Sequence, residues 1–169
     1  MKKLALMLVM AACLVCMLAL AVCAVDIGGI DYSFDKSTME ATVTSNNKNC
    51  GMEVVNIPST VEYDGGTYTV AYIANSAFRN NTVIKSITTP STIKNIYPHA
   101  FREMTALETL VINASEEFKY FDNAEVYKCT ALREADLSGC VGLVDFGNAG
   151  SYSHTFLGCT SLKIGRAHV

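Results

Sequence analysis

Hydrophobic residues recur at fixed distances from one large apolar residue, here called the lead residue, in the middle of the chain. In the copies led by Phe78 and Phe101, a threonine follows four residues later, and apolar residues follow six and nine residues later. A third copy is led by Val126 and a fourth by Phe156, and both keep the threonine at the same offset. Segments that repeat their apolar positions in this way stack as successive coils, each covering the next.

The first two lead residues are 23 residues apart, and the second is followed by the segment Leu107-x-x-Leu110-x-Ile112. This period and spacing are typical of a leucine-rich-repeat solenoid. Alternation along the segment predicts a strand with Leu110 and Ile112 facing inward and Thr109 and Val111 facing outward. We therefore predict an α/β to mainly β fold, a solenoid with short parallel strands and an N-terminal β cap.

Residues 25–63 are predicted to form the N-terminal β cap and the first coil, and residues 64–162 the leucine-rich repeats. Ile30–Phe34 and Met39–Val43 alternate apolar and polar positions, which indicates two strands joined by a short loop. The phrase Ile57–Val61 matches Thr89–Ile93, but an insertion of nine residues, Glu62–Val70, follows only the first of them. Its Asp-Gly-Gly sequence between aromatic positions predicts a β-hairpin.

The first 24 residues, Met1–Ala24, have two lysines, a long apolar run and a small-residue site, which are the features of a signal peptide. An uncleaved membrane anchor and a lipidated cysteine are the alternatives. Each of the three exports the chain, so we expect a secreted or cell-surface protein. Residues 163–169 resemble the translation of a sequencing adapter; we exclude them from the fold and expect the chain to be a fragment.

Between the signal segment and this tail, nine basic residues stand against sixteen acidic ones, a net charge of −7. Nucleic acid and anionic lipid both require a basic face. We therefore predict no nucleic-acid partner, and membrane contact only through the export signal or an anchor.

The same part of the chain has four cysteines. Cys129 and Cys159 occupy the position that Asn81 and Met104 hold in the other copies, which predicts buried free thiols. A disulfide and a metal site are the alternatives.

Several phrases of the repeats are specific enough to indicate a family. They are Ile57-Pro58-Ser59-Thr60-Val61, Ala77-Phe78, Ala100-Phe101, Leu137-Ser138-Gly139-Cys140 and Phe156-Leu157-Gly158-Cys159-Thr160-Ser161-Leu162. These phrases resemble the repeats of BspA-like leucine-rich-repeat surface proteins, which many Bacteroidota export. The resemblance covers residues 26–162 and implies a role in adhesion to host proteins or to other bacteria. Val126 in place of phenylalanine and the long loop after Phe146 depart from the pattern.

Residues able to support catalysis are few. His99 and His154 are the histidines outside the tail, and neither belongs to a metal-binding or nucleophile motif. The sequence has no phosphate loop, dinucleotide fingerprint or G-x-S-x-G elbow. We therefore predict that the protein is not an enzyme and has no cofactor and no metal. The alternative is a repeat segment of a larger exported hydrolase or protease, truncated after Leu162.

The candidate ligand-binding surface is the outward side of the predicted sheet, where adjacent strands place their residues in rows about 4.8 Å apart. Its residues are Ser86, Thr88, Thr109, Val111, Glu134 and Asp136. The rows grade from hydroxyl-bearing to acidic, which favours a basic or hydroxyl-rich partner, a protein or glycan on a host or bacterial surface. Binding through the loops Glu116–Asn123 or Gly147–Ser153 is the alternative. Three tyrosines either form an aromatic platform that binds carbohydrate or pack the hairpin of the cap. They are Tyr63, Tyr68 and Tyr72.

Overall fold

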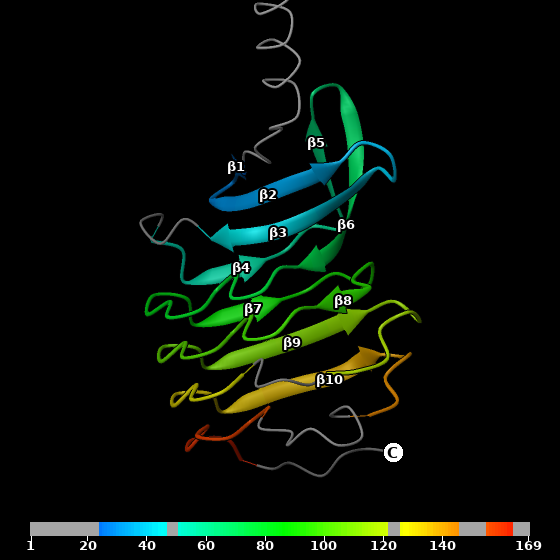
Figure 1. Cartoon of the computed structure of the whole chain (residues 1–169). Helices are drawn as coiled ribbons and strands as arrows, with labels where there is room; N and C mark the ends of the chain where they lie inside the picture. Colours follow the sequence, from blue (N-terminus) through cyan, green and yellow to red (C-terminus); the bar gives the residue numbers. More distant parts are fainter. Residues whose placement is uncertain (1–23, 47–50, 122–125, 146–154, 164–169) are drawn as a thin grey trace, which may run out of the picture.

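The computed structural model describes residues 24–46, 51–121, 126–145 and 155–163. Several features of the sequence lie outside these ranges. They are the predicted signal peptide before Ala24, Cys50, His154, the loop Gly147–Ser153 and the tail after Lys163. Within them the regular elements are all strands, and about four coils stack into one solenoid (Figure 1). The described ranges hold no helix that is long and apolar enough to cross a membrane. The predicted fold class, α/β to mainly β, is confirmed, and the structure is of the mainly β type.

One sheet forms the N-terminal cap and continues onto the solenoid. It has the order β1-β2-β3-β6-β5, and β8 pairs with β6 beside this path. The pairs β1–β2, β2–β3 and β5–β6 are antiparallel, whereas β6 runs parallel to both β3 and β8. The six strands are β1 (Val25–Ile27), β2 (Ile30–Asp35), β3 (Glu40–Asn46), β5 (Thr60–Tyr63), β6 (Gly66–Ile73) and β8 (Asn95–Ile96). The two predicted cap strands and the predicted hairpin are therefore present, and the hairpin joins the cap to the coils.

Aromatic side chains fill the cap. The Phe34 ring stacks on Tyr63 with centroids 4.3 Å apart and meets Tyr68 edge-on at 4.8 Å. Tyr72 is turned elsewhere, because the β3–β6 pairing is irregular at this point and its ring neighbours Tyr97 at 6.3 Å. Tyr63 and Tyr68 thus serve packing within the cap.

The second sheet is the parallel one that the repeats predict. Its order is β10-β9-β7-β4, with every neighbouring pair parallel. Leu110 and Ile112 are fully buried, and Thr109 and Val111 between and beside them are half-buried, so the predicted alternation is confirmed. The strands are β4 (Val54–Asn56), β7 (Ser86–Thr88), β9 (Thr109–Ala114) and β10 (Glu134–Cys140).

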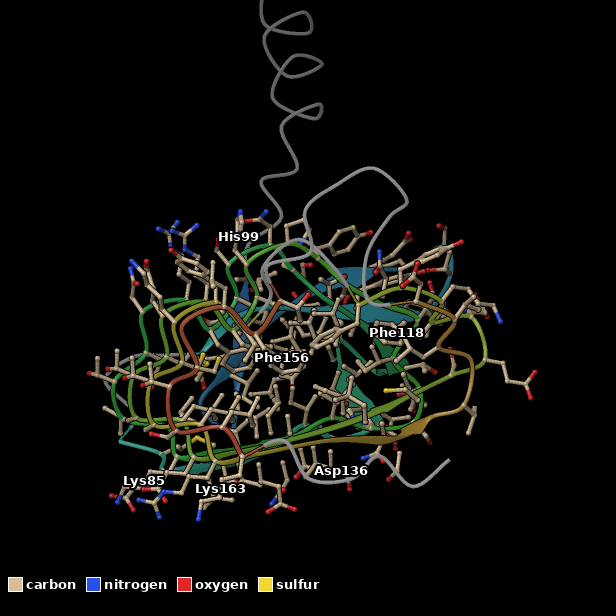
Figure 2. All side chains as sticks on the ribbon, turned by 90° about the horizontal axis from the view of Figure 1, so that it is seen from below. Lys85, His99, Phe118, Asp136, Phe156 and Lys163 are labelled. Atoms are coloured by element: carbon tan, nitrogen blue, oxygen red, sulfur yellow. The ribbon has the colours of Figure 1, made fainter. Side chains whose placement is uncertain are left out.

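The remaining sides of each coil complete a continuous core. The rings of the lead residues Phe78 and Phe101 stack with centroids 5.7 Å apart. Figure 2, which looks along the stack from below, shows Phe118 and Phe156 pointing into the interior of the ring of coils. The opposite wall is lined by the buried residues Ile93, Ile96, Phe118 and Phe121.

The backbone turns sharply at the second residue after each lead residue. Asn80, Glu103, Lys128 and Gly158 have φ angles of 59°, 60°, 57° and 82°. In this left-handed conformation the N–H of Glu103 donates to the carbonyl of Tyr127 at 2.7 Å, and the N–H of Lys128 to the carbonyl of Leu157 at 2.8 Å. The turn therefore links each coil to the next, although a non-glycine residue adopts it at some cost in conformational energy.

The three described repeat cysteines are free thiols in the core, as predicted. The Sγ atom of Cys129 donates to the carbonyl of Phe101 at 3.0 Å, and that of Cys140 to the carbonyl of Ile112 at 3.2 Å. Cys159 does the same with the carbonyl of Val126 at 3.0 Å. Burial, with a contribution from Asp136, raises the pKa of the Cys140 thiol to about 11. Each thiol thus satisfies a carbonyl of the preceding coil while it fills space as a small apolar group.

Candidate functional site

The six residues of the predicted surface lie in two rows across the parallel sheet. In the first row, Thr109 pairs in register with Ser86 on one side and Glu134 on the other. In the second row, Val111 pairs with Thr88 and Asp136 in the same way. Neighbouring strands are about 4.8 Å apart, so one ligand can touch all members of a row. The structure thus brings the six residues together; their binding of a ligand stays a prediction.

Both rows extend onto β4, which lies outside the predicted surface. Val54 pairs with Ser86, and Asn56 pairs with Thr88. Val54 is a large apolar side chain with 57% of its surface exposed. The signal for these two residues was present in the sequence, because the match of Ile57–Val61 to Thr89–Ile93 aligns the preceding strands as well. Each row therefore has four members, and the face is wider than predicted.

The face points into solvent over its whole length. Figure 2 shows Asp136 directed away from the interior, on the opposite side of the sheet from Phe156. Glu134 is exposed, whereas Ser86, Thr109 and Val111 are half-buried because each is flanked by the side chains of neighbouring strands. A row of short side chains held by a hydrogen-bonded sheet keeps its shape, so little ordering is required when a ligand binds.

Negative charge gathers at the β10 end of the face. The Oδ1 atom of Asp136 accepts the backbone N–H of Ser138 at 2.8 Å. Hydrogen bonds from the Ser138 hydroxyl and backbone hold the pKa of Asp136 below its usual range, so this carboxyl is ionised at neutral pH. Glu134 adds a second carboxylate, while β7 offers the hydroxyls of Ser86 and Thr88, and β4 at the other end has the uncharged Val54 and Asn56. The gradient from hydroxyl to acid that the sequence predicts is present in the structure.

A column of alternating charges borders the face where the strands begin. It consists of Glu53, Lys85, Glu108 and Arg133, each directly before a strand of the sheet. The Lys85 ammonium lies 2.9 Å from the Glu53 carboxylate, and this contact raises the pKa of Lys85. The Arg133 guanidinium lies 3.6 Å from Glu108. Because the signs alternate, the column carries no net charge, and the potential of the face comes from β10.

Groups able to bind a metal or drive catalysis do not converge in the described part of the chain. No cluster of three or more histidine, cysteine or carboxylate side chains occurs there. His99 lies in a coil corner with a φ of 63°, and its Nδ1 atom is buried without a hydrogen-bond partner. Of the alternative loop Glu116–Asn123, the described residues Glu116 and Glu117 are exposed, and Glu117 forms an ion pair with Lys94 at 3.0 Å.

Comparison with protein families assigns the repeats. The model of the BspA type leucine rich repeat region matches residues 44–163 in six copies. The chain belongs to the BspA-type leucine-rich-repeat family. The family resemblance that the sequence predicts is therefore confirmed. No curated protein matches the chain.

A solved structure of a bacterial leucine-rich-repeat protein shares the fold. A leucine-rich repeat protein from Bacteroides capillosus superposes with a TM-score of 0.62 at 22% identity, over 78% of this chain and 93% of that one. A leucine rich cell surface protein from Faecalibacterium prausnitzii gives a TM-score of 0.46 at 18% identity, over 68% of this chain and 42% of that one. At these identities the BspA-type chain and the Bacteroides capillosus protein share an architecture, and ligands do not transfer between them.

Proposed function

We propose that this BspA-type protein is an exported, cell-surface recognition module that binds a protein or glycan through the outward face of β4, β7, β9 and β10 and has no catalytic role. The observation that carries the proposal is the register of the two outward rows across four strands. A flat, prearranged set of side chains of this kind is how solenoids bind extended ligands. The features of Met1–Ala24 and the family support export.

The charge gradient supports a proposal for the chemistry of the partner. Glu134 and Asp136 on β10 favour a cationic or hydrogen-bond-donating group, while Ser86 and Thr88 on β7 favour hydroxyl groups. A ligand that spans the face therefore places its basic end over β10. We expect a basic or hydroxyl-rich segment of a host or bacterial surface molecule.

A binding measurement with two soluble probes tests the proposal. The probes are a short lysine-rich peptide and a neutral glucan, titrated against the protein by calorimetry. Replacing Thr109, Val111, Glu134 and Asp136 together by alanine should weaken binding of the better probe at least about ten-fold, because these residues form the centre and the acidic end of the face. The melting temperature should change little, since none of the four belongs to the core.

The matched control is the double variant Glu116→Gln, Glu117→Gln, which also removes two carboxylates but leaves the face intact. It should bind like the unmodified protein. Full affinity in the face variant, or an equal loss in the loop variant, would move the site to the loop and refute the proposal.

A further inference from the structure

The turn that follows each lead residue forms a basic corner, away from the proposed binding face. Arg79 and Arg102 are the first residues after Phe78 and Phe101, and Tyr127 holds the same place after Val126. The terminal nitrogens of the two arginines lie 3.6 Å and 3.3 Å from the carboxylate of Glu103. One carboxylate thus holds two guanidinium groups from adjacent coils side by side.

The Tyr127 ring lies against two cationic side chains. The Arg102 guanidinium lies 4.8 Å from the centre of the ring, and the Lys128 ammonium lies 5.1 Å from it. Contacts of this type hold an arginine in one orientation, so less side-chain entropy is lost when an anion binds it. The corner therefore presents prearranged cations, whereas lone surface lysines sample many positions.

Positive charge is in excess among the described residues of this corner. Among the described residues of the corner, Arg79 and Arg102 share the carboxylate of Glu103, and Lys128 adds a third cation through its contact with the Tyr127 ring, although the chain between the signal segment and the tail has a net charge of −7. A guanidinium has five N–H donors, and Glu103 accepts from Arg102 at 3.3 Å through one of them. The side chains of Arg79 and Arg102 are 40% and 28% exposed, although the Nε atom of each is buried without a hydrogen-bond partner. The backbone N–H of Arg102 donates to the carbonyl of His99 at 3.1 Å, and Figure 2 shows His99 on a different side of the ring of coils from Asp136.

We propose that the corner formed by Arg79, Arg102, Tyr127 and Lys128 binds an anionic glycan, a polysaccharide that carries sulfate or carboxylate groups. Arginine forms paired hydrogen bonds with such planar or tetrahedral anions. The two guanidinium groups come from adjacent coils and meet at one carboxylate, so both can contact neighbouring anionic groups of one polymer. Binding of an acidic peptide in place of the glycan is an outcome that the test below distinguishes. This site is independent of the outward strand face, which is acidic at one end and lacks cations.

Matched probes test this assignment. Dextran sulfate and neutral dextran share a backbone and differ in their sulfate groups, and poly-glutamate represents an acidic peptide. The intact protein should bind dextran sulfate, should not bind neutral dextran, and should bind poly-glutamate at least ten-fold more weakly. The double variant Arg79→Gln, Arg102→Gln should lose at least about ten-fold in affinity for dextran sulfate, and its binding should depend less on salt concentration.

The control variant Lys85→Gln, Arg133→Gln removes two positive charges from the column beside the sheet and should keep its affinity. Equal weakening of the two double variants would mean that net charge alone attracts the probe, and would overturn the proposal. So would tighter binding of poly-glutamate than of dextran sulfate, or no binding of dextran sulfate. Lys128→Gln provides a variant outside the arginine cluster; it should weaken binding about three-fold, and an unchanged affinity would count against the site.

Discussion

Replacing Leu110 by alanine tests the strand register on which the proposed binding face depends. Leu110 is fully buried in the inner strand β9, where it pairs with Ile87 on one side and Ala135 on the other. Thr109, the preceding residue, points outward and is half-buried. Because side chains alternate along a strand, a shift of the register by one residue would exchange these two environments.

The expected loss is large. Leucine-to-alanine changes at fully buried sites remove the transfer free energy of the side chain and leave a cavity, and typically cost about 3 to 5 kcal/mol. The lower end, about 3 kcal/mol, applies here because the neighbouring Ala135 is only partly buried and the wall can relax toward the gap. For a domain of this size that loss lowers the melting temperature by roughly 6 to 12 °C.

Thermal and urea unfolding, followed by circular dichroism, give the free energy of unfolding of Leu110→Ala and of a control variant. Thr109→Ala is the matched control on the same strand and should change the free energy of unfolding by about 0.5 kcal/mol or less. Equal losses in the two variants, or a greater loss for Thr109→Ala, would show that β9 does not face the core as described. The two outward rows would then lose their basis.

Two further predictions concern buried groups. Cys129, Cys140 and Cys159 should react with a thiol reagent only after denaturation, since all three lie in the core and donate to carbonyls; rapid labelling of the native protein would contradict this. Tyr32→Phe should stabilise the protein by about 1 kcal/mol, because the fully buried Tyr32 hydroxyl has no hydrogen-bond partner. Burial raises the pKa of Tyr32 from 10.0 to about 12, so between these pH values only the unfolded chain loses the proton. Stability should therefore fall as pH rises through this window, and urea unfolding of the Tyr32→Phe variant should show a smaller fall.

Periodicity predicted the parts of the fold in which local pattern and tertiary structure agree. Leu110 and Ile112 could be placed inward because alternation on a strand is a local property that the sequence displays directly. Tyr72 could not be placed in the same way. The irregular pairing of β3 with β6 turns it toward Tyr97, and that irregularity depends on two strands that are distant in sequence.

The basic corner illustrates a different limit. Arg79, Arg102 and Tyr127 share one offset from their lead residues, so an alignment of the coils would have placed them in one column. What the alignment lacks is the geometry by which Glu103 pairs with both arginines and Tyr127 packs against one of them. The left-handed turn at Glu103 creates that arrangement, and glutamate is not a residue type that indicates such a turn.

The alternating column beside the strands has a consequence for how such a protein can change length. Glu53, Lys85, Glu108 and Arg133 place opposite charges next to each other at each coil boundary. Duplication or deletion of a single coil would bring two like charges together, whereas a change by two coils would preserve the alternation. Each exposed pair contributes at most about 1 kcal/mol, so this is a bias that accumulates over many coils. We therefore expect coils of this solenoid to be gained and lost in pairs, because a change by an even number of coils keeps opposite charges next to each other in the column.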